Sequence, residues 1–368
     1  MIVVGAGIIG TSIAWRTAAC GLSVMVVDPD AVSSGASSVA AGMLAPVTEA
    51  AYGEEDLLSL NLASARMMPK FLKDLAAATG DVIETHSDAT LFLSIDRDQK
   101  EALSRLHAFQ QRLRLETRML SAEACRQLEP ALTPAVKAGV LAEGDVAVDP
   151  RPLVATLEKA CHAAGVLFDR GSAVSEVLES AGSARGVSLE DGRTIRASTV
   201  VIAAGCWSGT IKGVPHELSK IRPVKGQILR LVPAGGEAVP IRHVLRTSDV
   251  YIVPRPHEVV VGATVEERGF DRSVTAGAVH ELLEDAFQIV PALREMELQE
   301  ASAGLRPTSP DNAPMIGWTS MKGVIAATGH FRSGILLAPI TADAVATLIS
   351  TGEVLRSIAP FSPGRFVR

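Results

Sequence analysis

A glycine-rich segment near the start of the chain carries residues that could bind phosphate. Gly5, Gly7 and Gly10 have the spacing GxGxxG, and they follow a short apolar stretch, Ile2 to Val4. The first glycine permits a tight turn, the second lets the backbone approach a pyrophosphate, and the third allows the next helix to pack closely. That helix, expected over Thr11 to Cys20, offers N–H groups and a partial positive charge. The segment predicts a dinucleotide site.

The residues after this helix favour FAD over a nicotinamide cofactor. Asp28 ends a second expected strand, Leu22 to Val27, where a carboxylate accepts hydrogen bonds from ribose hydroxyls and disfavours a 2′-phosphate. Ser33 to Met43 consists almost entirely of small residues, which let a long ligand lie against the backbone. A flexible linker is the alternative, but apolar Val39 and Leu44 indicate packing.

A second glycine-rich segment lies at the opposite end of the chain. Val324 to Thr328 reads as a buried strand, Gly329 as a tight turn, and the residues up to Pro339 as the start of a helix that follows Arg332. This arrangement suits closing over the flavin end of FAD. Both chain ends must then meet around one cofactor, which favours a flavoenzyme.

Composition limits the class of protein. With 368 residues the chain is long enough for two domains, and a hydrophobic content of 47% supports two cores. The net charge of −6 argues against nucleic acid or an anionic membrane as a partner. The four cysteines and eight histidines lack metal-ligand spacing, so we expect no metal and reduced thiols in a cytoplasmic protein. We expect neither a signal peptide nor a transmembrane span.

The remaining pattern predicts an α/β protein, α+β overall, with interleaved segments. Helices are expected over 57–79, 98–116, 153–164 and 276–289, and strands over 90–94, 174–177, 186–189, 194–197, 199–205, 227–232, 250–254 and 259–264. We predict a Rossmann-type FAD-binding domain from residues 1–80, 148–217 and 303–368. A substrate domain, an antiparallel sheet with helices, is inserted as residues 81–147 and 218–302.

The sequence resembles the D-amino-acid oxidase superfamily of FAD enzymes and, within it, the glycine oxidases associated with thiamine biosynthesis. The resemblance covers essentially the whole chain. Besides the two glycine-rich segments, it rests on these stretches: Gly35-Ala36-Ser37, Ala40-Ala41-Gly42-Met43-Leu44, Arg222-Pro223-Val224-Lys225-Gly226-Gln227, Tyr251-Ile252-Val253-Pro254-Arg255 and Gly304-Leu305-Arg306-Pro307.

The resemblance implies roles for individual residues. The positions that match FAD contacts are Gly5, Gly7, Ile8, Ile9, Gly10, Asp28, Pro29, Ala36, Ser37, Ala41, Gly42, Met43, Val174, Gly205, His330, Phe331, Arg332, Ser333, Gly334, Ile335 and Leu336. The N–H groups at the second helix start would lie near the flavin edge that becomes negative on reduction. The positions that match substrate-carboxylate contacts are Arg306, Arg332 and Tyr251. No residue is assigned a catalytic role.

These three substrate residues also make chemical sense. A planar guanidinium recognises a carboxylate with two hydrogen bonds. Arg332 stands in an apolar segment, and no Asp or Glu lies between Val324 and Thr341. A salt bridge to a local acid is the alternative for Arg332, an exposed loop position the alternative for Arg306, and an ordinary strand aromatic the alternative for Tyr251.

The implied reaction is the oxidative deamination of glycine to glyoxylate, ammonia and H2O2, with hydride transfer from Cα to the flavin and O2 as acceptor. No dedicated base is needed if the amine binds neutral, so His330 is expected to support a turn or contact the flavin. Relatives that bind FAD covalently use a cysteine near residues 311–317. This chain has no cysteine after Cys206, so FAD is expected to be non-covalent.

Two positions depart from the glycine oxidase pattern and leave the substrate open. Asp249 replaces a histidine, and Val265 replaces a methionine. Asp249 could attract an ammonium or face solvent, and the smaller Val265 would leave more room. Sarcosine, N-alkyl glycines, small D-amino acids or a larger N-carboxymethyl amine remain alternatives to glycine. A dehydrogenase that reduces a quinone and a non-catalytic flavin subunit also remain. Relatives suggest a homotetramer.

Overall fold

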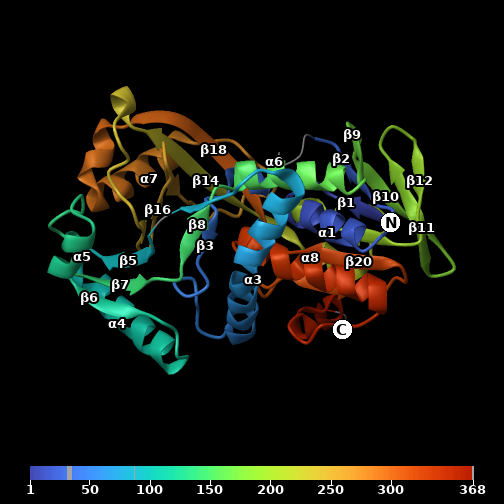
Figure 1. The fold of residues 1–368 in the computed structure, drawn as a ribbon, viewed down its shortest axis with the longest axis horizontal. Helices are drawn as coiled ribbons and strands as arrows, with labels where there is room; N and C mark the ends of the chain where they lie inside the picture. Colours follow the sequence, from blue (N-terminus) through green and yellow to red (C-terminus); the bar gives the residue numbers. More distant parts are fainter. Residues whose placement is uncertain (31–34, 87, 367–368) are drawn as a thin grey trace.

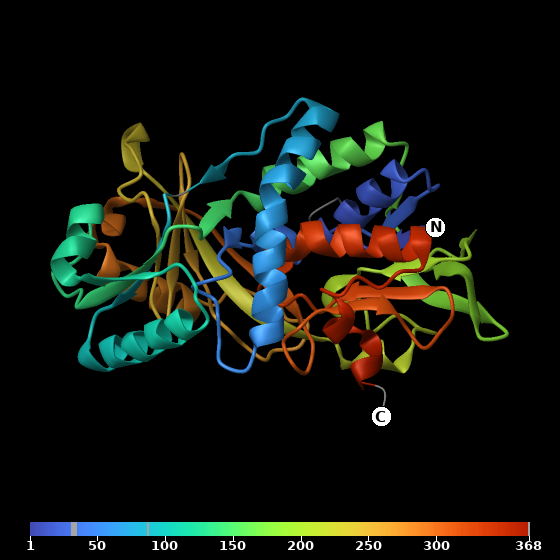
Figure 2. The same cartoon turned by 60° about the horizontal axis from the view of Figure 1, so that its bottom comes forward.

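The computed structural model describes residues 1–30, 35–86 and 88–366, so Ser33 and Ser34 of the small-residue segment lie outside the described residues. Two lobes lie side by side along the longest axis (Figure 1). The long helix α3 (Glu55–Thr79) stands between them (Figure 2), and both chain termini lie in the same lobe. The first and last segments of the chain therefore build one unit.

This first lobe contains a six-stranded sheet that combines the start, the middle and the end of the sequence. Its order is β19 (Met315–Trp318), β20 (Val324–Thr328), β13 (Val200–Ile202), β1 (Ile2–Val4), β2 (Met25–Asp28) and β9 (Leu167–Arg170). All neighbours are parallel except β19 and β20. The central strands are buried on both faces, as their continuous apolar runs predict.

Alternating side chains divide the core of this lobe into two layers. Val3, Val201 and Ile325 face the helices α1 (Ile8–Ala19), α3, α6 (Pro150–Ala163) and α8 (Gly334–Thr351). Val4 and Ile202 face a smaller sheet of β10 (Val174–Ser180), β11 (Ser183–Leu189) and β12 (Thr194–Arg196). Side chains of a strand point alternately to opposite faces, which explains the division.

Helix α8 is the one helix in the described part of the chain that is long and apolar enough to cross a membrane, and 67% of it is buried inside the protein. It packs against α1 and α3 in the core of the first lobe. The core helix of a soluble protein has the same composition, so this helix is weak evidence for a membrane span.

The second lobe contains an eight-stranded sheet. Its order is β18 (Glu297–Thr308), β14 (Arg222–Val232), β17 (Val259–Gly262), β16 (Tyr251–Pro254), β15 (Val244–Arg246), β5 (Thr90–Ser94), β7 (Ala138–Ala142) and β6 (Arg118–Ser121). The expected antiparallel sheet is mixed, because β15 and β5 pair in parallel. Helix α7 (Ala276–Ile289) covers one face, and α4 (Arg97–Arg112) and α5 (Ala122–Leu128) pack on the far strands. The expected boundary at residue 303 falls inside β18.

Short elements connect the lobes. Helix α2 (Ala36–Val39) forms within the small-residue segment and packs against β18 and α6. The strands β3 (Met43–Leu44), β8 (Val146–Val148) and β4 (Thr85–His86) form a small separate sheet. The small-residue segment is thus packed between the lobes, as its apolar residues predict.

Candidate active site

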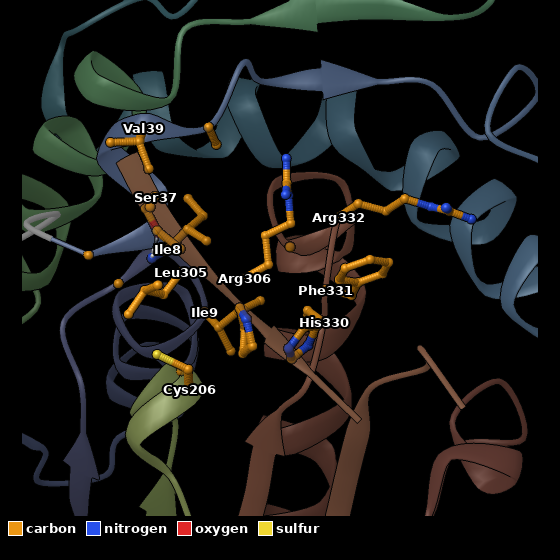
Figure 3. Close-up of a pocket in the computed structure, with 18 of the residues that line it drawn as sticks. Ile8, Ile9, Ser37, Val39, Cys206, Leu305, Arg306, His330, Phe331 and Arg332 are labelled. Atoms are coloured by element: carbon orange, nitrogen blue, oxygen red, sulfur yellow. Dashed lines mark hydrogen bonds between the residues drawn. The ribbon is translucent and has the colours of Figure 1, made fainter. Parts of the chain in front are cut away.

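A cavity of about 920 Å³ lies between the lobes and is lined by both (Figure 3). It extends from the first glycine-rich turn, past α2, to the start of α8. Every residue predicted from the sequence to contact cofactor or substrate lines this cavity except Gly10. A side chain on Gly10 would overlap the carbonyl oxygen of Gly5, so this glycine permits the close packing of α1 on the turn.

The turn before α1 is held by two side chains that were predicted to face the cofactor. The hydroxyl of Ser37 accepts a hydrogen bond from the Ile8 amide at 3.0 Å. The Asp28 carboxylate accepts one from the Ala6 amide at 2.6 Å, and burial raises the pKa of Asp28. The amides of Ile9 and Gly10 make no hydrogen bond to any described residue. The N-terminus of α1 therefore keeps donors for an anion.

The start of α8 offers a second set of free donors. Ser333 provides no side-chain cap, and within the described chain the amides of Gly334, Ile335 and Leu336 have no acceptor. The positive end of the α8 dipole thus points at the cavity. His330, which precedes α8, shares a hydrogen bond of 3.0 Å with the Thr341 hydroxyl. Burial lowers the pKa of His330 to about 3, so its imidazole is neutral near pH 7.

These features fit FAD. One long cavity joins two helix N-termini, which suit the pyrophosphate at one end and an electron-rich ring at the other. Asn61 also lines the cavity, and its side-chain oxygen is buried without a hydrogen-bond partner. A buried acceptor of this kind needs a donor, and a ligand in the cavity would supply one.

The strand register gathers the predicted substrate residues on one face of the eight-stranded sheet. Tyr251 pairs with Gly262, and Arg306 on β18 lies two residues beyond Gly304, which pairs with Gly226. A Cβ atom on Gly262 would stand 2.5 Å from the Tyr251 hydroxyl, and one on Gly226 would overlap the Arg306 guanidinium. The two glycines therefore let the Tyr251 ring and the Arg306 side chain lie flat over the sheet.

Arg306 and Tyr251 interact with each other. Desolvation raises the pKa of the partly buried Tyr251 phenol, although the charge of Arg306 and a hydrogen bond from it act in the opposite direction. The guanidinium of Arg306 donates to the carbonyl oxygens of Thr264, at 2.9 Å, and Lys225, at 3.4 Å. No carboxylate in the described part of the chain pairs with it. Arg306 is thus a cavity-lining cation without an anion.

Arg332 differs from Arg306 in this respect. Its guanidinium pairs with Glu49 at 3.3 Å and with Glu54 at 3.0 Å, and its side chain extends away from Arg306 (Figure 3). No Asp or Glu lies between Val324 and Thr341, and both partners come from a distant segment of the chain. The anion that Arg332 requires is therefore present in the protein.

Glu49 and Arg246 are cavity residues that the sequence argument missed. Arg246 lies directly opposite Tyr251 on the neighbouring strand, and its Nη1 donates to the Glu49 carboxylate at 2.6 Å. Neither residue belongs to a recognisable motif. Only the pairing of β15 with β16 brings Arg246 to Tyr251, and β15 has three residues, too few to show a period.

Three further cavity residues bear on the sequence predictions. Cys206 lines the cavity, and burial raises the pKa of its thiol to about 12, which keeps it protonated. Asp249 is exposed and accepts hydrogen bonds from Gln99 and Ser248. Val265 is 71% exposed. Both positions that depart from the family pattern therefore stand at the solvent edge of the cavity.

A sheet of Rossmann type with an elongated cavity, joined to a second sheet whose Arg306 has no carboxylate partner among the described residues, fits a flavin-dependent oxidoreductase. The comparison with known families agrees: the family described as FAD dependent oxidoreductase matches residues 1–348. The chain belongs to this family, and its cofactor is FAD.

Individual relatives narrow the class. The chain is 31% identical to a glycine oxidase of Geobacillus kaustophilus over 99% of this chain and 96% of the relative. The crystal structure of glycine oxidase from that organism matches with a TM-score of 0.91, covering 100% of this chain and 98% of the other. A bifunctional protein ThiO/ThiG of Trichormus variabilis is 31% identical, and the chain spans 55% of its length. An iminodiacetate oxidase from Chelativorans is 25% identical with a TM-score of 0.87, over 98% of each chain.

Proposed function

We propose that the protein is an oxidase of glycine that also accepts sarcosine, N-alkyl glycines and small D-amino acids. The observation that carries the proposal is the Arg306 guanidinium, which faces the cofactor cavity beside the Tyr251 hydroxyl and has no carboxylate partner among the described residues. An amino acid supplies the missing carboxylate. The glycine oxidase relatives, which match the chain over nearly its whole length, support this substrate class.

The side chains position the substrate and do not themselves exchange a proton with Cα. Arg306 holds the carboxylate with its free N–H groups, and the Tyr251 hydroxyl donates a hydrogen bond to the same carboxylate. Tyr251 remains a donor near pH 7 because burial raises the pKa of its phenol. His330 is neutral and bonded to Thr341, so it takes no part in proton transfer. Fixing the substrate in this way converts much of its binding energy into alignment for reaction.

Bound FAD would supply the oxidising chemistry, as the acceptor of the hydride from the substrate Cα and the source of the two electrons that reduce O2 to H2O2. Residues that would hold it are those at the two helix starts, together with Ser37, Gly42 and Asp28. The imine product reacts with water to give glyoxylate and ammonia. The ThiO/ThiG relatives support a role in thiamine biosynthesis.

The remaining parts of the proposal concern the setting of the enzyme. We place it in the cytoplasm as a homotetramer with amino acid and O2 as its small-molecule partners, and without nucleic acid or membrane partners. We assign residues 1–80, 148–217 and 303–368 to FAD binding and residues 81–147 and 218–302 to substrate binding.

A panel of small amines scored for peroxide in air tests the proposal. Glycine and sarcosine should each give glyoxylate and H2O2 in equal amounts, because each turnover oxidises one amine and reduces one O2. Reduction of a quinone dye by glycine with negligible peroxide would instead identify a dehydrogenase. Turnover of neither glycine nor any other amine in the panel would reject the proposed substrate class.

A further inference from the structure

We infer that Glu49 determines substrate specificity: it neutralises the arginines beside Tyr251, so that the pocket accepts one carboxylate and rejects an amine substituent that carries a second. This inference rests on the proposed function and concerns the same site. It names the substrate class as monocarboxylic amines and assigns the selection against dicarboxylic amines to one residue.

The charges that line the cavity near Tyr251 are the first observation. The arginines that line the cavity are Arg246, Arg272, Arg306 and Arg332. Arg272 and the carboxylate Asp249, which also lines the cavity, are exposed, where solvent screens their charges. Glu49 bonds Arg246 at 2.6 Å and Arg332 at 3.3 Å, and Glu54 bonds Arg332 at 3.0 Å. The charges of Arg246 and Arg332 are thus balanced by those of two glutamates. Arg306 remains as the cation that can bind one substrate carboxylate.

The position of the neutralised pair is the second observation. Strand order places Tyr251 on β16 between Arg246 on β15 and Gly262 on β17. The hydroxyl of Tyr251 lies close enough to Arg306, Arg246 and Glu49 for all three charges to act on it. The Arg246–Glu49 pair therefore lies on the side of Tyr251 opposite Gly262, next to a residue that we propose binds the substrate carboxylate.

The third observation is that Arg246 keeps unused donors. Its Nε and Nη2 have no hydrogen-bond partner among the residues that the structure describes, and its guanidinium lies 5.4 Å from the centre of the Phe92 ring. Its geometry would suit a second carboxylate, but the Glu49 carboxylate, 12% exposed, repels one. Removing the charge of Glu49 leaves Arg246 as an uncompensated cation with free donors.

Binding of non-oxidisable ligands to the FAD-loaded protein tests the inference without relying on turnover. Methoxyacetate and diglycolate are the ether analogues of sarcosine and iminodiacetate, and they differ by the second carboxylate. Their dissociation constants follow from the change in flavin absorbance. We expect the wild type to bind methoxyacetate at least tenfold more tightly than diglycolate, and Glu49→Gln to reduce this preference at least tenfold. Equal binding of both by the wild type, or an unchanged preference in Glu49→Gln, would overturn the inference.

Matched variants separate charge from damage to the fold. Glu54→Gln also replaces a carboxylate by an amide, but it affects the partner of Arg332 and leaves Glu49 paired with Arg246. The wild-type preference should therefore persist. Glu49→Gln combined with Arg246→Leu should lose the gain in diglycolate binding. A gain that survives the loss of Arg246 would overturn the inference. If Glu49→Gln fails to fold, the wild type still tests the inference, because equal binding of both ligands by the wild type would overturn it.

Turnover then connects the inference with the proposed function. The ratio of kcat/KM for iminodiacetate to that for sarcosine should rise at least tenfold in Glu49→Gln, mainly through KM. If neither amine is oxidised while the ligand preference follows Glu49, the proposed function fails and the specificity inference stands. If sarcosine is oxidised but the ligand preference is unchanged in Glu49→Gln, the proposed function stands and the specificity inference fails.

Discussion

At the scale of single residues, partners decide what each cavity arginine can do. Arg306 bonds two backbone carbonyl oxygens and keeps its charge for a ligand, whereas two glutamates compensate Arg332. A carboxylate ligand gains most where it meets a cation that is already partly desolvated and unpaired. We therefore assign the substrate carboxylate to Arg306, and the positioning of Glu49 to Arg332.

Arg306→Lys should raise the KM for glycine roughly 10- to 150-fold, because a hydrogen bond to a charged group contributes about 1.5–3 kcal/mol and lysine cannot form the planar pair. The bound flavin should keep its absorbance spectrum. Steady-state kinetics against glycine provide the measurement, with flavin content as the control. A variant with the wild-type KM would remove Arg306 from the substrate site.

His330 gives a prediction about acid stability. The folded pKa of about 3 lies below the ordinary value of 6.5, so the unfolded chain binds a proton that the folded protein does not. The stability that this neutral imidazole contributes is present above pH 6.5 and is lost as the pH falls towards 3. His330→Gln, which can still bond Thr341, should lose less free energy of unfolding between pH 6.5 and 4, by up to about 1.4 kcal/mol per pH unit. The free energy of unfolding is measured by denaturation at several pH values. The same pH dependence in the wild type and in His330→Gln would contradict the assignment.

The residue types at the site were largely predictable from sequence, but their pairing was not. Arg306, Tyr251 and the residues of both glycine-rich segments stand in the cavity. Nothing near Arg332 in the sequence revealed Glu49 and Glu54, because those contacts span more than 270 residues. The electrostatics of a pocket depend on such long-range pairs. The residues next to Arg332 in the sequence therefore did not show that two carboxylates neutralise its charge.

At the scale of elements, one sheet face positions the two residues that we propose bind the substrate. Glycines on β14 and β17 leave room for side chains from β18 and β16 to lie over them. The positions of Arg306 and Tyr251 are thus set by register, with the space above the sheet kept open by the lack of a Cβ atom.

Gly262→Ala should displace the Tyr251 hydroxyl, because the added Cβ would lie 2.5 Å from it. We expect the KM for glycine to rise roughly 3- to 10-fold, the value of one neutral hydrogen bond. Gly277→Ala is the matched control, since nothing lies within 4 Å of a Cβ atom there. In a Tyr251→Phe background the effect of Gly262→Ala should largely disappear. An equal effect in that background would show that the glycine acts elsewhere.

Sustained apolar spacing was the most reliable signal for single elements. Helix α7 and strand β5 have the predicted bounds, because their apolar spacing is sustained over the element. Length alone did not decide the outcome: the three-residue strand β1 has its expected bounds, whereas β3, β15 and the twelve-residue β18 were not predicted as strands. The parallel pairing of β15 with β5 joins residues about 150 positions apart, which no local pattern indicates.

At the scale of the whole molecule, the two ends of the chain enclose one cavity. The turn before α1 and the start of α8 lie in the same lobe and line the same space (Figures 1 and 3). The glycine spacing and the strand–turn–helix patterns predicted this meeting from sequence. One face of the sheet in the second lobe closes the cavity. Only some of the strands of this sheet could be predicted from the sequence.

FAD should be released intact when the protein is unfolded. Cys206 is the one cysteine among the described residues that lines the cavity, and burial keeps its thiol protonated, with a pKa of about 12. A protonated thiol is a poor nucleophile. After acid precipitation we expect the yellow colour in the supernatant and an unmodified chain by mass spectrometry. Flavin that stays with the precipitated chain would contradict non-covalent binding.

Anaerobic mixing of the FAD-loaded protein with glycine tests the central claim most directly, because it observes electron transfer from substrate to cofactor without any later step. The account predicts that the flavin absorbance bleaches at a rate that saturates with glycine, and that the colour returns within seconds when air is admitted. Flavin that stays oxidised at high glycine concentration, in a protein fully loaded with FAD, would contradict it.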